Sequence, residues 1–505
     1  MGNVLLRAYG GLWRLAEPLL RRHKRLRDDF EERLVPDGWP AMAAGRAAFL
    51  NFKAPASLRL WIQAASAGEA WLLHSLLPAI VEEFASHPML VSRPLHILCT
   101  SCTRQGMDVL AKLPELIPMV PPPADGESEE YTPPFVQNAF VFTRFFPLDT
   151  PELMEKALRR TDPHLMILLE TEIWPGLLSA AKNQAVPVMV VNGRMTSKSF
   201  SGYRLFSRFW RENAPEDILA MMPEDGQRFA KLFGNASRVS LMSNIKFDRM
   251  AQTRPAAKAS LLRTRAGIPD NALLVVLASV RKEEEKALLS VLLDLYGTVV
   301  EGCPVALAVA PRHMHRVEAW REKLSAVGLA FVQRSHICDA KTGVRGLTKD
   351  GDALPGPLPV YLWDSFGELT TLYAIADVAF VGGSLAPLGG QNFLEAPAQG
   401  IFPLVGPHIE NFLWVGDDFF SQGLGRRVTR KTLSKELEWS LGERRKSLCS
   451  YPGGDVELDW NCVRRAEKNK ARLRFGAWLS PRRGGSVQAA RAVAAKLLAL
   501  LGGVR

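Results

Sequence analysis

The chain has 505 residues, a net charge of +11 and six scattered cysteines. A chain of this length exceeds one ordinary hydrophobic core, so we expect two domains, and so few cysteines exclude a disulfide scaffold. The basic balance favours an anionic partner. Nucleic acid is the weakest choice, because the sequence has no zinc-finger spacing and no RNA-binding aromatic signature.

The N-terminal segment, Met1–Phe30, carries apolar residues near helical spacing that are repeatedly interrupted by Arg and Lys. It is too short and too charged to span a bilayer, and it lacks the cleavage site of a secretory signal. We expect an amphipathic helix that lies on an anionic membrane surface. The alternative is a helix packed on the domain with a solvated basic end.

Strand-like apolar runs alternate with helical patterns along the rest of the chain, which predicts α/β domains with parallel sheets. The first half offers runs at 58–65, 95–101, 140–146, 165–171, 186–192 and 218–222. The second half offers 273–279, 305–310, 329–333, 360–363, 378–382 and 402–405. Two Rossmann-like domains facing across a cleft are expected. We expect the domain boundary near 243–255, surface loops at 121–130 and 341–359, and a last helix at 486–501. The charged stretch 426–474 has no clear pattern and is left unassigned.

The segment Val378–Phe412 is the most informative stretch of sequence. A strand runs into glycine pairs, then into Asn392 and Glu395 at the start of a helix, and then into a second strand. Glycines let backbone amides approach an anion closely, and a helix N-terminus adds partial positive charge. We therefore predict a nucleotide-sugar site here; the alternative is an ordinary strand–turn–helix.

Polar residues that directly follow strands in the first half are candidates for chemistry, because ligands bind at the carboxyl ends of parallel strands. Glu69 could accept a proton from an attacking hydroxyl, or could merely satisfy a helix N-terminus. Thr103 could bind sugar hydroxyls or phosphate, or cap the next helix. Two acids beside Trp174 are an unusual combination at a strand end, and a bridge from Glu170 or Glu172 to Arg194 is the structural alternative.

The second half offers a phosphate-binding set. Arg312 follows a strand, and a planar guanidinium suits an oxyanion, although a surface arginine is the alternative. The sequence DSFGEL could present backbone amides and Glu368 to a nucleotide. The candidate acids and the histidines of the chain do not have the spacing of metal ligands. No P-loop or GxGxxG motif stands in its required context either. Both absences are consistent with a metal-independent transferase.

The motifs ASAGE, ETEIWPG, NGRM, SNIKFD, APRH, GELTTLYAIADVAFVGGS, GGQNFLEA and GPHIENF follow one another in this order. Together they resemble the 3-deoxy-D-manno-octulosonic acid (Kdo) transferases of lipopolysaccharide biosynthesis, from about Ala65 to Phe412. The resemblance implies the GT-B fold. It also implies a CMP-Kdo donor, a lipid A precursor as acceptor, and a peripheral or monotopic location at the cytoplasmic face of the inner membrane.

Carried over by position, the resemblance makes Glu69 the general base of an inverting displacement that needs no metal and no cofactor. It places donor contacts on Ser279, Arg312, Gly367, Glu368, Asn392 and Glu395. Acceptor or structural roles would fall to Ser66, Gly68, Thr103, Glu172 and Arg194. The implied domains are a membrane-associating segment at 1–35, an acceptor domain at 36–245, a nucleotide-sugar domain at 246–485 and a helix at 486–505.

The chain departs from the family pattern where Gln63 and Gln391 replace histidines, and where Val280 and Arg281 replace a Thr–His pair. Ser243 also stands where the family usually has Gly. Glutamine keeps hydrogen bonding but cannot titrate near neutral pH. Two alternatives therefore stay open: a GT-B transferase with another CMP-acidic sugar or a UDP-sugar donor, and a degenerate GT-B binding protein.

Overall fold

The computed structural model describes residues 2–23, 26–39, 57–117, 139–250, 262–337, 356–449 and 459–502. The chain forms two compact units: unit 1 contains residues 1–249 and 482–505, and unit 2 contains residues 250–481. The predicted loop at 121–130 and most of the one at 341–359 lie outside the described residues. Because unit 1 includes residues 482–505, the C-terminal helix, which we predicted as a separate segment, belongs to unit 1.

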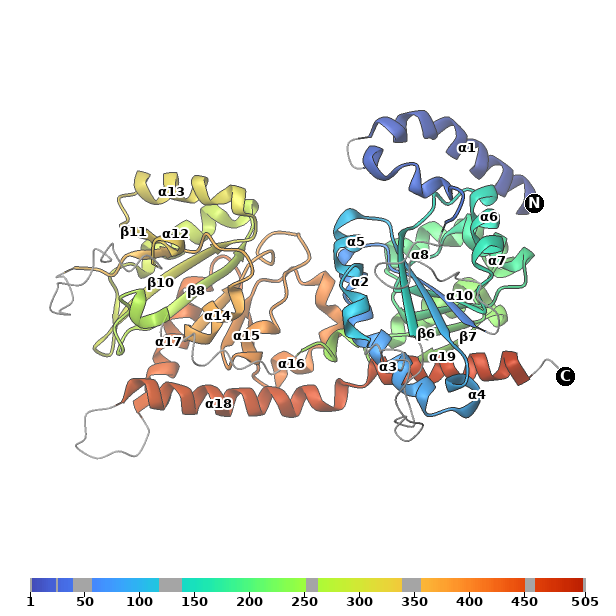
Figure 1. The fold of residues 1–505 in the computed structure, drawn as a ribbon. Helices are drawn as coiled ribbons and strands as arrows, with labels where there is room; N and C mark the ends of the chain where they lie inside the picture. The colour runs from blue at the N-terminus through green and yellow to red at the C-terminus, as the bar shows by residue number, and fades with distance from the viewer. Residues whose placement is uncertain are drawn as a thin grey trace, which may run out of the picture. The chain divides into compact units, whose positions relative to one another are not determined.

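Unit 1 is built on a sheet of parallel strands in the order β3-β2-β1-β4-β5-β6-β7 (Figure 1). The strands are β1 (Leu58–Gln63), β2 (Leu95–Ser101), β3 (Ala139–Phe145), β4 (Leu165–Leu169), β5 (Val188–Gly193), β6 (Asp217–Ala220) and β7 (Arg238–Leu241). β2, β4 and β5 are buried along their whole length, because helices cover both faces. The direction of strand order reverses between β1 and β4. Such a reversal, called a topological switch point, creates a crevice at the carboxyl ends of the two strands.

The helices of unit 1 connect these strands. They are α1 (Gly2–Arg22), α2 (Ala67–Ala70), α3 (Leu73–Ala85), α4 (Pro88–Val91), α5 (Arg104–Leu110), α6 (Pro151–Thr161), α7 (Pro175–Asn183), α8 (Ser197–Tyr203), α9 (Ser207–Glu212), α10 (Pro223–Phe233) and α19 (Gly485–Gly502). Short 3₁₀ turns lie at Arg27–Asp29, Glu32–Leu34, Leu113–Leu116, Arg204–Phe206, Gly234–Ala236 and Ile245–Phe247.

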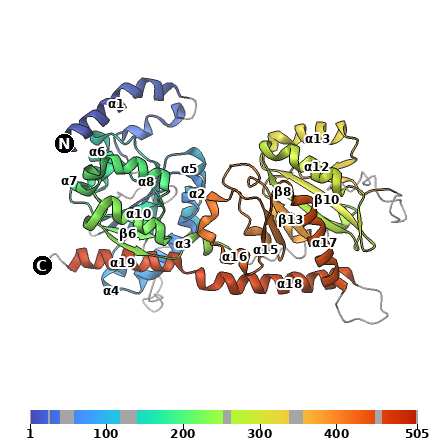
Figure 2. The same ribbon diagram turned by 180° about the vertical axis from the view of Figure 1, so that it is seen from behind.

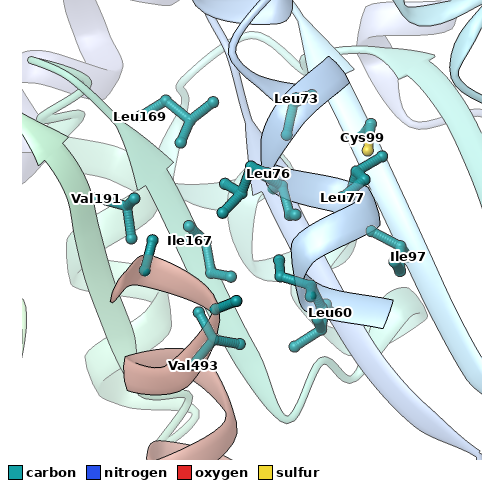
Figure 3. Close-up of a cluster of buried hydrophobic side chains, with 14 of the residues drawn as sticks. Leu60, Leu73, Leu76, Leu77, Ile97, Cys99, Ile167, Leu169, Val191 and Val493 are labelled. Carbon is teal, nitrogen blue, oxygen red and sulfur yellow. The ribbon is translucent and has the colours of Figure 1, made fainter. Parts of the chain in front are cut away.

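One apolar core of unit 1 lies between the sheet and α3, α5 and α19 (Figure 3). Val493 of α19 packs in the same cluster as Ile167 and Val191 of the central strands. The motif SNIKFD ties α19 in place, because the Asp248 carboxylate accepts hydrogen bonds from the backbone amides of Gly484 (2.7 Å) and Ser486 (2.6 Å). A second core, on the opposite face, is covered by α6, α7, α9 and α10.

Helix α1 is fastened to unit 1 by polar contacts. The Tyr9 hydroxyl donates to Asp149 (2.9 Å), and Arg14 pairs with Glu152 (2.7 Å). The predicted N-terminal helix is therefore present and one side of it contacts the domain. Over the ranges that the structure describes, none of the helices combines the length and the apolar character needed to cross a bilayer.

Unit 2 contains a second sheet with the order β11-β12-β10-β8-β13-β14-β15 (Figure 2). Its strands are β8 (Leu273–Val280), β9 (Val299–Val300), β10 (Cys303–Pro311), β11 (Phe331–Gln333), β12 (Val360–Leu362), β13 (Val378–Val381), β14 (Phe402–Val405) and β15 (Arg426–Arg427). All pair in parallel except β9, which is antiparallel to β10. Here the strand order reverses between β8 and β13.

The helices of unit 2 are α12 (Glu285–Leu295), α13 (Val317–Ala326), α14 (Leu369–Ile375), α15 (Glu395–Ala398), α16 (Asp418–Ser421), α17 (Leu433–Cys449) and α18 (Trp460–Leu479). The 3₁₀ turns are Lys282–Glu284, Met314–Arg316, Arg334–Ile337, Glu410–Val415 and, at the end of the unit, Ser480–Arg482. The charged stretch 426–474, which had no assignment from sequence, supplies β15, α17 and α18. Two doubly wound domains in one chain confirm the α/β fold of the GT-B class.

Candidate functional sites

The carboxyl ends of β1 and β2 carry a buried polar chain in unit 1. The Trp61 indole donates to the Thr100 hydroxyl (2.8 Å), which donates to the Gln63 carbonyl oxygen (2.6 Å). The Gln63 amide then contacts the Cys102 sulfur (3.4 Å). Gln63 is fully buried, so a neutral amide suits this position better than a charge, and each of its ends has a partner.

Glu69 lies in the first turn of α2, directly beyond β1. Its carboxylate oxygen Oε2 accepts from the Ser66 amide (3.0 Å) and from the Ser66 hydroxyl, and the Ser66 hydroxyl in turn accepts from Gly68. This is a capping box, the structural role considered above. The side chain is only partly buried, and across the described ranges Glu69 makes no ion pair, so its other oxygen is available to a ligand.

Glu172, at the carboxyl end of β4, accepts a hydrogen bond from the Trp174 indole (2.6 Å). Burial raises the pKa of Glu172 to about 7, and the charges of Glu69 and Glu170 raise it too; hydrogen bonds from Trp174 and Gln63 oppose the shift. Glu172 and Glu69 are therefore electrostatically coupled neighbours. The switch point of this sheet holds a carboxyl group that gains or loses its proton near neutral pH.

Glu170 pairs with Lys246 (2.5 Å) rather than with Arg194. Among the described residues, neither Glu170 nor Glu172 forms the suggested ion pair with Arg194; instead the Thr171 hydroxyl donates to the Arg194 carbonyl oxygen (2.6 Å). Glu170 has a left-handed backbone (φ 58°), a strained conformation that is common at functional strand ends. The Arg194 backbone is therefore part of this crevice.

Thr103 and Gly176 have structural roles. The Thr103 hydroxyl accepts from the Gly106 amide (3.0 Å) and caps α5, so the capping alternative describes it. In the motif ETEIWPG, the Gly176 amide donates to the buried Asp149 carboxylate (2.8 Å). A Cβ at Gly176 would lie 2.5 Å from the Asp149 carbonyl oxygen, which explains why glycine stands here.

A pocket of about 360 Å³ opens at the switch point of unit 2, beyond the carboxyl ends of β8, β10 and β12. Five of the six predicted donor residues line it: Ser279, Arg312, Gly367, Asn392 and Glu395. Residues from four separate segments of sequence thus meet in one place. Glu368 is not among the lining residues, and its carboxylate forms an ion pair with Arg334 (3.0 Å).

The polar residues of this pocket are oriented by one another. The Asn392 amide donates to Glu395 (2.8 Å). Burial raises the pKa of Glu395, against the opposing effects of this hydrogen bond and of the positive charge of Arg312. Arg312 itself is exposed, and the hydrogen bonds and salt bridges described for unit 2 include none made by its guanidinium, which leaves its fork open to an oxyanion.

Trp363 and Phe366 also line the pocket and were missed from sequence. The Trp363 indole nitrogen is buried without a hydrogen-bond partner, an unusual state for this donor. Phe366 is 77% exposed, which is high for a large apolar side chain. Trp363 could have been predicted from its position, directly after a strand and before DSFGEL.

The predicted role of the glycine-rich loop after β13 was wrong. Its amides were expected to face an anionic ligand, but those of Gly383 (2.6 Å), Ser384 (2.8 Å) and Leu385 (2.7 Å) donate to the buried Glu284 carboxylate. The anion of this loop is therefore the chain's own side chain. The following helix, α15, has only one turn, so it adds little dipole.

Residues 38–249 match the family model of 3-deoxy-D-manno-octulosonic-acid transferase (kdotransferase). The 3-deoxy-D-manno-octulosonic acid transferase of Bordetella pertussis is 29% identical over 408 residues, which cover 80% of this chain and 84% of that protein. The Chlamydia pneumoniae protein of the same name is 28% identical and covers 69% of each chain. Over most of its length, the chain is therefore similar to Kdo transferases.

The family match places Glu69, Glu172 and Arg194 inside the matched residues 38–249. Among solved structures, the C-terminal CMP-Kdo binding domain of WaaA from Acinetobacter baumannii aligns with 44% of this chain and 96% of that domain. That alignment has 23% identity and a TM-score of 0.33. The family-model match and the similarity to Kdo transferases support the expectation that the chain is a glycosyltransferase.

The described part of the chain contains no group of three or more His, Cys, Asp or Glu side chains arranged to hold a metal ion. Cys99 and Cys102 are both free thiols, and burial raises the pKa of Cys102 to about 12. A thiol this weakly acidic is a poor nucleophile.

Proposed function

We propose that this chain moves Kdo from CMP-Kdo to a lipid A precursor at the cytoplasmic face of the inner membrane, with inversion and without a metal. The observation that carries the proposal is the position of Glu69, a partly exposed carboxylate at the switch point of unit 1, within the segment that matches the family. Its second oxygen is free for an acceptor hydroxyl, while Ser66 fixes the first.

Glu69 would act as general base. The acceptor hydroxyl gives its proton to Glu69 as its oxygen bonds to the anomeric carbon of Kdo, and the bond from that carbon to the CMP phosphate oxygen breaks. A protonated Glu172 would keep a second negative charge away from Glu69 while this happens. Because the pKa of Glu172 is about 7, this arrangement is favoured on the acidic side of neutrality.

The pocket of unit 2 would hold the donor. The open guanidinium of Arg312 suits the phosphate of CMP, which gains charge as it leaves. Asn392 and Glu395 present an amide and a carboxyl that could contact sugar hydroxyl groups, and the unpartnered Trp363 indole is a further donor in the pocket. Gln391 lines the same pocket. The neutral amide of Gln391 stands where the family pattern has a histidine, and this difference would change how the acidic sugar is held.

Helix α1 would bring the enzyme to its lipid acceptor. Leu12, Leu15 and Leu19 are 66%, 78% and 73% exposed, and their spacing places them on one side of the helix. Tyr9 faces Asp149 of the domain instead. An apolar stripe beside Arg21 and Arg22 fits the interface of an anionic bilayer.

The direct test is incubation of the purified chain with a CMP-Kdo generating system and lipid A precursor, followed by mass analysis of the lipid. We expect a mass increase of one or more Kdo units that requires CMP-Kdo. Transfer only from a UDP-sugar, or binding of CMP without turnover from any donor, would overturn the proposal. The second result would instead support a degenerate binding protein.

A further inference from the structure

Unit 2 contains a second and larger cavity, of about 590 Å³, which shares no lining residue with the pocket of Arg312 and Asn392. It lies at the opposite edge of the sheet, because Val378 and Phe402, which line it, are the first residues of β13 and β14. Residues of helices α17 and α18 and of the loop around Leu424 also line it. The proposed transfer reaction does not use this cavity.

The charged residues of the lining are four arginines, Arg426, Arg427, Arg444 and Arg474, and two acids, Asp377 and Glu443. Glu443 is paired with Lys446 (3.0 Å), which lies outside the lining. Arg426 pairs with Glu436 (2.6 Å), and Arg427 with Asp417 (2.5 Å), two carboxylates that lie outside the lining. Arg474 is exposed and donates to the neutral Gln422 carbonyl (3.2 Å). Its charge is therefore not balanced by this contact.

Arg444 is the most constrained of the four. Its side chain is 12% exposed, and its nitrogen Nε lies 3.5 Å from the Asp377 carboxylate. Its nitrogen Nη2 is buried and has no hydrogen-bond partner. A buried guanidinium nitrogen without an acceptor is costly, and such a group in a cavity wall indicates a missing acceptor.

Asp377 cannot supply that acceptor, because three arginines share its carboxylate. Arg464 lies 2.9 Å away and Arg263 lies 3.7 Å away, in addition to Arg444. The side chain of Lys468 is buried nearby, and burial lowers its pKa well below the usual value. A lowered pKa reduces the charge of Lys468, so the excess of positive charge here comes from the three arginines that share one carboxylate.

The floor of the cavity is apolar. Val378, Ile401, Phe402 and Leu424 contribute to it, and the Trp439 ring lies beneath the Arg426 guanidinium at 3.8 Å. Trp439 is 47% exposed. The volume falls within the range of small-molecule sites, which combine an apolar lining with a few oriented charges. The combination suits a ligand with an anionic head and an aliphatic body.

We propose that this cavity binds a phosphate monoester with an aliphatic body, of the kind found in phosphatidic acid, with the phosphate at Arg444 and Arg474 and the aliphatic part on the floor of Val378 and Phe402. An aliphatic body is favoured over a nucleoside because the floor offers apolar contacts. The site is separate from the proposed donor pocket, so its occupancy does not depend on the identity of the donor.

The test uses the full chain and dihexanoyl phosphatidic acid below its micellar concentration, with calorimetry and tryptophan fluorescence as readouts. We expect saturable binding, a ligand-dependent fluorescence change that Trp439→Phe reduces, and at least tenfold weaker binding in Arg474→Gln. Ala471→Phe, which narrows the cavity without a change in charge, should weaken binding as much. Arg465→Gln, on an exposed position of α18 outside the cavity, is the matched control and should bind as the parent does.

Parent-like binding in both Arg474→Gln and Ala471→Phe would overturn the proposal. Equal affinity for inorganic phosphate would overturn the role of the aliphatic body, and competition by CMP would place the ligand in the nucleotide pocket instead. Both variants change partly or fully exposed positions, so thermal unfolding close to that of the parent would show that they fold.

Discussion

The Gly383 amide donates to the Glu284 carboxylate at 2.6 Å, across 99 positions of sequence. Glu284 is fully buried and also accepts from Ser384, Leu385 and Arg281. A carboxylate at the end of β8 therefore shapes the glycine loop after β13. β8 and β13 are the two strands at the switch point, so Glu284 ties together the segments that follow them.

Glu284→Gln should destabilise unit 2 by about 2–4 kcal/mol, because an amide cannot accept from four donors and brings donors of its own into a buried site. Chemical denaturation measures this loss. Glu283→Gln is the control, since Glu283 is exposed, and it should change stability by less than about 0.5 kcal/mol. Equal stability of the two variants would contradict the role given to Glu284.

Glu69→Gln should lower the rate of sugar transfer by about 10²–10⁴, the usual contribution of a general base. Binding of CMP should stay at the parent level, because the donor pocket is built entirely from residues of unit 2. Single-turnover transfer and calorimetric titration with CMP measure the two effects. Glu82→Gln, an exposed site on α3 of the same unit, is the control. Parent-like transfer by Glu69→Gln would remove Glu69 from the mechanism.

Glu172→Gln should change how stability depends on pH. In the folded chain the pKa of Glu172 is about 7, above its usual value of 4.5, so the unfolded chain ionises first as pH rises. The ionisation of Glu172 therefore lowers the free energy of unfolding of the parent by about 2–3 kcal/mol between about pH 4.5 and 7. The variant should lack this loss in urea titrations across that range. An unchanged pH profile would show that Glu172 is ionised throughout.

Gly176→Ala should destabilise unit 1 by about 1–3 kcal/mol, because the new methyl group meets the Asp149 carbonyl oxygen at 2.5 Å. Gly202→Ala is a matched control on α8, where a Cβ meets nothing within 4 Å and helix propensity improves. We expect it to be neutral or stabilising by up to about 1 kcal/mol. Thermal unfolding of both variants tests the contrast; a tolerated alanine at 176 would mean that α7 can shift.

Leu15→Glu together with Leu19→Glu should reduce recovery of the protein with anionic vesicles several-fold, because two charges interrupt the exposed stripe of α1. High salt should reduce recovery further by screening the arginines of this helix. Leu473→Glu, at a site that is 73% exposed on α18, carries the same kind of change elsewhere. Sedimentation with vesicles measures the effect, and equal recovery of all variants would exclude α1 as the contact.

Much of the fold could be predicted from the sequence because parallel strands buried on both faces produce continuous apolar runs. The run 95–101 coincides with β2, and the run 402–405 with β14. β7, β9 and β15 were missed because they are short and two of them are partly exposed at edges. The helices α17 and α18 were missed because their charged faces hide the apolar period.

For the candidate sites, the sequence by itself determined which residues follow which strands, and hence that Ser279, Arg312, Asn392 and Glu395 meet at one edge of a sheet. Only the tertiary structure decided how their neighbours are used. Glu368 pairs with Arg334, and the glycine amides serve Glu284. Sequence order limits a residue to the end of a strand, but the partner of a charge depends on which distant groups burial brings within about 3 Å, and a local pattern carries no record of that distance.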